Sequence, residues 1–89
     1  MRVVVTVTGK DKVGIIAAIC TLLAAHNVNV LDISQTILQR IFTMNMLVDI
    51  ASADVSFSEL AALLEKEGSR LALSIRAQRE DIFDAIHKI

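Results

Sequence analysis

The fold is decided by the stretch RVVVTVT-GKDKVGI, residues 2–15. Residues 2–8 are β-branched almost throughout, which favours a central strand. Gly9 and Gly14 supply the backbone freedom that a tight turn requires, and the short acid Asp11 lies between them. An apolar run follows at once. The stretch therefore predicts a strand that turns directly into the N-terminus of a helix.

The next segment, residues 15–26, has the spacing of an amphipathic helix. Its apolar side chains recur at intervals of three and four residues, namely Ile16, Ile19, Cys20 and Leu23. We expect the helix to end near His26-Asn27, because asparagine tolerates the left-handed conformation that closes a helix.

Two strands joined by a short reversal are expected next. Residues 28–39 return to β character, and we place Leu31, Ile33 and Ile37 on one face. A reversal at 39–41 contains neither Gly nor Pro. Residues 42–50 then alternate between apolar and polar side chains, which is typical of a half-buried antiparallel strand.

A second helix and a last strand complete the chain. Ser56 and Glu59 have the spacing of a capping box, so the helix is expected to begin there and to end at Gly68. Residues 70–78 alternate as a strand. Residues 80–89 have an apolar face at helical spacing and predict a short C-terminal helix.

This element order predicts an α+β fold, the ferredoxin-like βαββαβ sandwich. Right-handed crossovers place four antiparallel strands in one sheet with two helices on one face. The first and third strands are then central, and the second and fourth are edges. Residues 1–89 contain no linker, so we expect a single domain with residues 79–89 as its helical extension.

Composition excludes several classes of function. The 89 residues are 54% apolar and have a net charge of −1, with no basic stripe for nucleic acid and no apolar run long enough to span a membrane. One cysteine cannot form an intramolecular disulfide, which favours a reduced, cytoplasmic setting. A small domain this apolar is expected to hide surface in a homodimer.

The sequence offers no catalytic or metal-binding constellation. Cys20 lies on the apolar side of a predicted helix, and neither His26 nor His87 has a partner at ligand spacing. We therefore expect a protein that is not an enzyme and that has no cofactor.

The turn before the first helix is the best candidate for a binding site. A helix N-terminus presents N–H groups without partners, and a ligand carboxylate can accept from the backbone of Val13, Gly14 and Ile15. Asp11 can either cap the helix or hold a ligand ammonium, and these roles compete. Lys12, with its neighbour Lys10, adds positive potential.

A purely structural interpretation is also open. Asp11 is a good N-cap residue, and Gly9 and Gly14 would allow close packing of strand and helix. Asn29, which opens the second strand, adds weight to the binding interpretation because its amide both donates and accepts. We expect Asn29 to approach the turn of a neighbouring subunit or of its own chain.

The whole chain resembles an ACT domain. The resemblance is carried by KDKVGI at 10–15, NVLDI at 29–33, DISQTIL at 32–38, FTM at 42–44 and QREDIFDAIH at 78–87. These stretches are similar to a bacterial and archaeal family of stand-alone ACT proteins related to the regulator of the glycine cleavage system.

The resemblance implies that an amino acid binds where two domains meet, often side by side in an eight-stranded sheet. It implies roles for Asp11, Gly14 and Asn29, with the backbone of Val30 and Leu31 completing the site. Many relatives carry Pro where this chain has Val13. Because the family has no attached enzyme, regulation would act on a separate partner protein.

We thus expect a non-enzymatic regulatory domain that binds an amino acid or similar metabolite at a dimer interface. The alternative is a ligand-free module for dimerisation or protein interaction. Its motivation is the apolar face of the predicted C-terminal helix, formed by Ile82, Phe83, Ile86 and Ile89.

Overall fold

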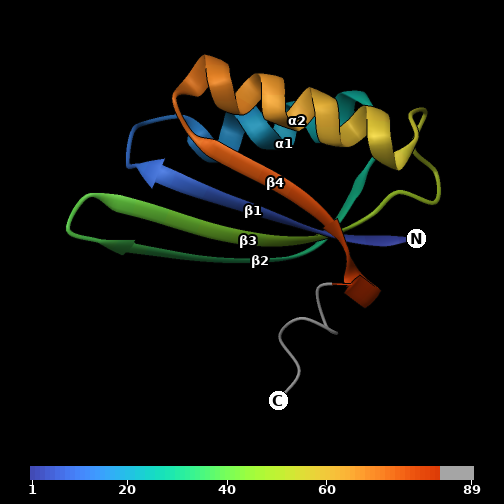
Figure 1. Cartoon of the computed structure of the whole chain (residues 1–89), viewed down its shortest axis with the longest axis horizontal. Helices are drawn as coiled ribbons and strands as arrows, with labels where there is room; N and C mark the ends of the chain where they lie inside the picture. Colours follow the sequence, from blue (N-terminus) through green and yellow to red (C-terminus); the bar gives the residue numbers. More distant parts are fainter. Residues whose placement is uncertain (83–89) are drawn as a thin grey trace.

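The computed structural model describes residues 1–82 and has the predicted ferredoxin-like βαββαβ fold. Its elements are β1 (Arg2–Lys10), α1 (Ile15–Ala25), β2 (Asn29–Leu38), β3 (Ile41–Asp49), α2 (Phe57–Leu71) and β4 (Ser74–Arg79). Both helices cover the same face of the sheet (Figure 1). Residues 80–82 are helical, and the remainder of the predicted C-terminal helix, 83–89, lies outside the described residues.

The strand order is β2-β3-β1-β4, so β1 and β3 are central and β2 and β4 are edges, as predicted. All three strand pairs are antiparallel. The core lies between the sheet and the helices, and its largest fully buried side chains are Val3, Val5, Val7, Ile19, Leu23, Met44, Met46, Val48, Leu60 and Leu64. The period-two alternation predicted for β3 thus has its apolar side under the helices.

The edge strand β2 is left largely uncovered. Every residue of β2 except Val30 is exposed. Ile33 pairs with Met46, and since directly paired side chains share a face, Ile33 lies on the helix side of the sheet without a helix above it. A β-bulge leaves Leu31 between two paired positions, so the uniform alternation predicted through this strand is interrupted there.

The end of α2 corrects the sequence-based boundary. The helix does not end at Gly68 but continues to Leu71, and Ala72 closes it with φ 58°. Gly68 is needed for packing, because a Cβ there would lie 2.8 Å from the carbonyl oxygen of Leu73. As a result β4 begins at Ser74, and the predicted strand residues before it belong to the helix and its closing turn.

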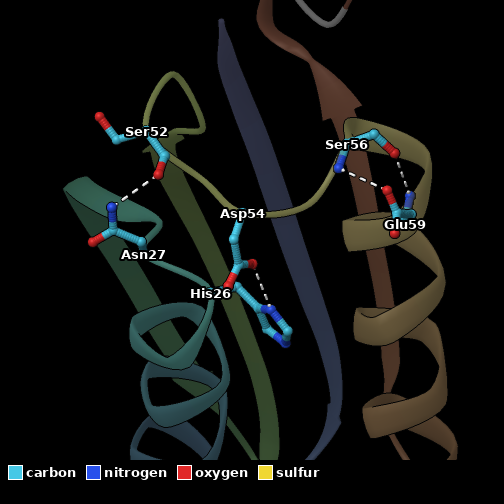
Figure 2. Close-up of polar contacts among 6 residues, drawn as sticks. All are labelled: His26, Asn27, Ser52, Asp54, Ser56 and Glu59. Atoms are coloured by element: carbon cyan, nitrogen blue, oxygen red, sulfur yellow. Dashed lines mark hydrogen bonds and ion pairs between the residues drawn. The ribbon is translucent and has the colours of Figure 1, made fainter.

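The end of α1 agrees with the sequence-based prediction, since Asn27 follows the helix with φ 58°. Two side-chain contacts then join this turn to the loop before α2 (Figure 2). Asn27 donates from Nδ2 to the carbonyl oxygen of Ser52 at 2.8 Å, and His26 Nδ1 lies 2.9 Å from Asp54 Oδ1. These contacts hold the two loops together at one end of the molecule.

The predicted capping box at the start of α2 is present (Figure 2). The Ser56 hydroxyl accepts from the Glu59 N–H at 3.2 Å, and the Glu59 carboxylate accepts from the Ser56 N–H at 3.1 Å. Both contacts satisfy donors at the helix start, which explains why α2 begins at Phe57.

Candidate functional site

The turn between β1 and α1 leaves the first turn of the helix uncapped by a side chain. Gly14 is the N-cap residue, with φ 90° and ψ 3°, and it supplies no side-chain hydrogen bond. By the geometry of an α-helix, the N–H groups of Ile15 and Ile16 have no acceptor within the helix. The preceding Val13 is fully exposed. The positive end of α1 therefore has backbone donors without an acceptor in the helix, beside an exposed turn residue.

Gly14 is required by backbone conformation and not by packing. A Cβ built at this position would meet no atom within 4 Å, whereas φ +90° is a conformation that side chains disfavour. Gly9 is the opposite case, because a Cβ there would collide with the side chain of Leu73. The structural interpretation of two packing glycines is thus right for Gly9 and wrong for Gly14.

Asp11 does not cap α1, which corrects the interpretation of this residue as the N-cap. The helix begins at Ile15, and its cap position is three residues beyond Asp11. Instead, the backbone N–H of Asp11 donates to the carbonyl oxygen of Arg40 at 2.7 Å. Of the two competing roles considered for its carboxylate, the capping role is wrong, and the interaction with a ligand ammonium stays a prediction.

Lys12 bridges the turn to the second helix. Its ammonium donates to the carbonyl oxygen of Leu71, the last residue of α2. A cation at a helix C-terminus satisfies a carbonyl that the helix leaves without a partner. Lys12 therefore adds positive charge to the turn, as expected, and also links the turn to the end of α2.

The hairpin between β2 and β3 lies beside this turn and was not anticipated as part of a site. Its loop residues Gln39 and Arg40 have φ 47° and φ 73°, the positive values of a type I′ turn. A cavity of about 450 Å³ is lined here by Lys10, Asp11, Ile37, Gln39, Arg40 and Ile41. A two-residue loop between alternating strands was the available signal, because such loops favour positive φ.

Asn29 lies at the opposite end of the sheet from Gly14. It pairs with Asp49, which also pairs with Arg2 at the start of β1, whereas the turn follows Lys10 at the end of β1. Eight residue steps along a strand span roughly 27 Å. Asn29 therefore cannot approach the turn of its own chain, and its approach to the turn of a neighbouring subunit stays a prediction.

The other predicted site residues have different environments. Ile15 is 2% exposed as a whole residue and belongs to the core. Val30 is half-buried and packs against the core. Leu31 is 45% exposed at the bulge of β2. These two residues accompany Asn29 at the far end of the sheet.

Other features of the described residues that bear on function are metal-binding groups, the cysteine and the length of the helices. Among residues 1–82, no group of three or more His, Cys, Asp or Glu side chains is arranged to hold a metal ion. Cys20 is half-buried against the core. In the same range of residues, neither helix combines the length and the apolar character needed to cross a membrane.

Comparisons with known proteins agree with this architecture. The model of the ACT domain family matches residues 1–78. A UPF0237 protein of Bifidobacterium longum is 51% identical over 88 residues, which cover 99% of this chain and 98% of the relative. An ACT domain protein from Streptococcus pneumoniae is similar with a TM-score of 0.82 and 37% identity over 94% of each chain.

A more distant structure shares the fold alone. It is named as a candidate glycine cleavage system transcriptional repressor, and it is similar with a TM-score of 0.72 at 22% identity. The similarity covers 86% of this chain and 44% of that one.

Proposed function

The chain belongs to the ACT domain family, and from that membership we propose that it is a non-enzymatic regulatory protein that binds an amino acid or similar metabolite between two copies of itself. ACT domains are in general small-ligand regulatory domains. The observation that carries the proposal is the β1–α1 turn, where an uncapped helix start coincides with a glycine that no packing contact requires.

The chemistry of the turn suits a zwitterion. A ligand carboxylate accepts from the free N–H groups at the start of α1, where the helix end is positive. Gly14 has no side chain to keep the ligand from this backbone. The carboxylate of Asp11, which is not used to cap the helix, receives the ligand ammonium.

The surface that supports a dimer is the edge of β2. Its exposed apolar side chains are Leu31 at 45%, Ile33 at 40%, Ile37 at 54% and Leu38 at 69%. An edge strand also presents N–H and C=O groups without partners, which favours pairing with another strand. Antiparallel pairing of two β2 strands about a two-fold axis would join two four-stranded sheets into one.

This pairing would complete the site. With the two-fold axis at the middle of β2, the first residue of one strand lies opposite the last residue of the other. Asn29 of the partner subunit would therefore lie beside Leu38, near the hairpin and the β1–α1 turn. The bulge at Leu31 would present backbone groups of Val30 and Leu31 to the same ligand.

A bound amino acid would act by favouring one arrangement of the dimer. The size of the shift is limited by the difference in ligand affinity between the two arrangements. A separate partner protein that recognises one arrangement would then respond to the metabolite.

The test is a thermal-shift screen of the twenty amino acids at millimolar concentration. At least one should raise the melting temperature, because a ligand that binds only the folded state stabilises it. Gly14→Val and Asn29→Ala should abolish the shift, and Gln78→Ala on the opposite edge strand should retain it. Absence of a shift with every amino acid would contradict the proposal.

The exposed β2 edge also favours a second candidate, a dimerisation module without a ligand. The same screen separates the two. A stable dimer whose melting temperature responds to no amino acid would favour the module.

A further inference from the structure

We propose that the cavity between the β1–α1 turn and the β2–β3 hairpin selects a dicarboxylic ligand, an amino acid with an acidic side chain. The inference rests on the proposed function and names the ligand class. The cavity has a volume of about 450 Å³ and is lined by Lys10, Asp11, Ile37, Gln39, Arg40 and Ile41. Small-molecule sites are typically about 300–1,000 Å³, so the space suits one small metabolite.

The charges that line the cavity do not balance for a neutral amino acid. Asp11 supplies one negative charge, whereas Lys10 and Arg40 supply two positive charges. A neutral zwitterion would place its ammonium at Asp11 and its carboxylate at the start of α1. Neither cation would then have an anion.

An acidic amino acid matches the charged groups of the cavity. Its α-carboxylate lies outside the cavity lining, at the start of α1, as in the proposed function. Its ammonium pairs with Asp11, and its side-chain carboxylate pairs with Arg40 and Lys10. Arg40 suits this last role because a guanidinium binds a carboxylate through two parallel hydrogen bonds. Ile41, which pairs with Lys10 and shares its face of the sheet, provides an apolar surface for the ligand methylenes.

The backbone places Arg40 beside Asp11. Its φ of 73° belongs to the type I′ turn of the β2–β3 hairpin. The carbonyl oxygen of Arg40 accepts from the N–H of Asp11 at 2.7 Å, so the residues that carry the cation and the anion are joined by their backbones.

The experiment is calorimetric titration of the full chain with aspartate, glutamate, asparagine and glutamine. Replacing the acid by its amide removes one charged partner while retaining size. We expect at least one acidic ligand to bind about tenfold more tightly than its amide, as for a charge-assisted hydrogen bond. Arg40→Gln should reduce that ratio to near one, and Arg76→Gln on β4 should preserve it.

The outcomes separate the two proposals. Equal affinity for acid and amide, or tighter binding of the amide, would overturn the inference and leave the proposed function intact. Binding of none of the twenty amino acids would overturn the proposed function and the inference with it. If Arg40→Gln fails to fold by circular dichroism, Lys10→Gln decides, and an unchanged acid-to-amide ratio in that variant would overturn the inference.

Discussion

The backbone N–H of Asp11 donates a 2.7 Å hydrogen bond to the carbonyl oxygen of Arg40. The bond joins the turn that precedes α1 to the tip of the β2–β3 hairpin, two loops that are distant in the sequence. It places an acid and a base from separate loops on the wall of one cavity. Substitutions in either loop are therefore expected to affect both stability and ligand binding.

Arg40→Gly should stabilise the protein and weaken ligand discrimination. Glycine adopts positive φ without steric cost, so the free energy of unfolding should rise by about 0.5–1 kcal/mol. Urea denaturation measures this change. Arg76→Gly, in the interior of β4, is the matched control and should lower the free energy of unfolding by a similar amount. Equal losses in both variants would show that φ at Arg40 carries no strain.

Gly14→Ala should lower the free energy of unfolding by about 1 kcal/mol because φ is +90°. No steric clash contributes, since no atom lies within 4 Å of the added Cβ. Gly14→Asn should cost less, because asparagine tolerates positive φ and can cap a helix. Chemical denaturation of both variants tests the explanation, which an equal cost for Ala and Asn would contradict.

Gly68→Ala should destabilise the protein although the residue lies within α2. Helix propensity alone would favour alanine by about 1 kcal/mol. The added Cβ would lie 2.8 Å from the carbonyl oxygen of Leu73, however, and backbone atoms cannot easily move away. We expect a net loss of about 1–3 kcal/mol. Ser69→Ala, at the next helical position, should be close to neutral, and a stabilising Gly68→Ala would refute this account.

Asp49 should contribute to stability only above acidic pH. A hydrogen bond from the backbone N–H of Ala51 at 2.9 Å lowers the pKa of the Asp49 carboxyl below its ordinary value, and the N-terminal ammonium at 3.5 Å lowers it further. A carboxyl with a lowered pKa in the folded state stabilises that state at pH above about 4 and loses the contribution as pH falls.

Asp49→Asn tests this dependence. The variant should be less stable than the parent at pH 7, and the difference should shrink as the parent carboxyl is protonated. Urea denaturation from pH 7 to pH 3 measures it. A difference that stays constant with pH would show that the carboxyl charge is not its cause.

Ile37→Lys should disrupt the proposed dimer without unfolding the chain. Ile37 is 54% exposed on β2, so a lysine there costs the isolated fold little but opposes pairing of two β2 edges. Light scattering should change from twice the 9.7 kDa chain mass to the chain mass itself. Ile82→Lys, on the segment after β4, is the control. Dissociation by Ile82→Lys alone would place the interface elsewhere.

Local patterns predicted the elements well, because each signal was contained within a few residues. The apolar alternation of β3, the capping box at Ser56 and Glu59, and the left-handed Asn27 all appear as expected. Together they were sufficient for the strand order, since right-handed crossovers leave few alternatives.

The sequence-based predictions failed for residue types that suit two structural roles, because only the packing of the folded chain selects one of them. Glycine often ends a helix, but Gly68 lies inside α2, where the close approach of the Leu73 backbone leaves no room for a side chain. Aspartate is often an N-cap residue, but α1 begins three residues after the position that Asp11 would cap, and its N-cap is Gly14. In each case the local preference was real, and the packing of the folded chain used the residue in another way.

The sequence by itself determined the order of strands and helices, the buried face of β3 and the family to which the chain belongs. These depend on side-chain periodicity and local turn chemistry, which a linear pattern contains. The sequence did not determine the buried face of α1, where Ile15 is buried and Ile16 is exposed.

Only the tertiary structure decided which segments meet: Asp11 with Arg40, Lys12 with the end of α2, and Asn29 far from the turn of its own chain. Strand register and turn geometry determine which residues come into contact and which stay apart. Both are fixed only when the strands pair.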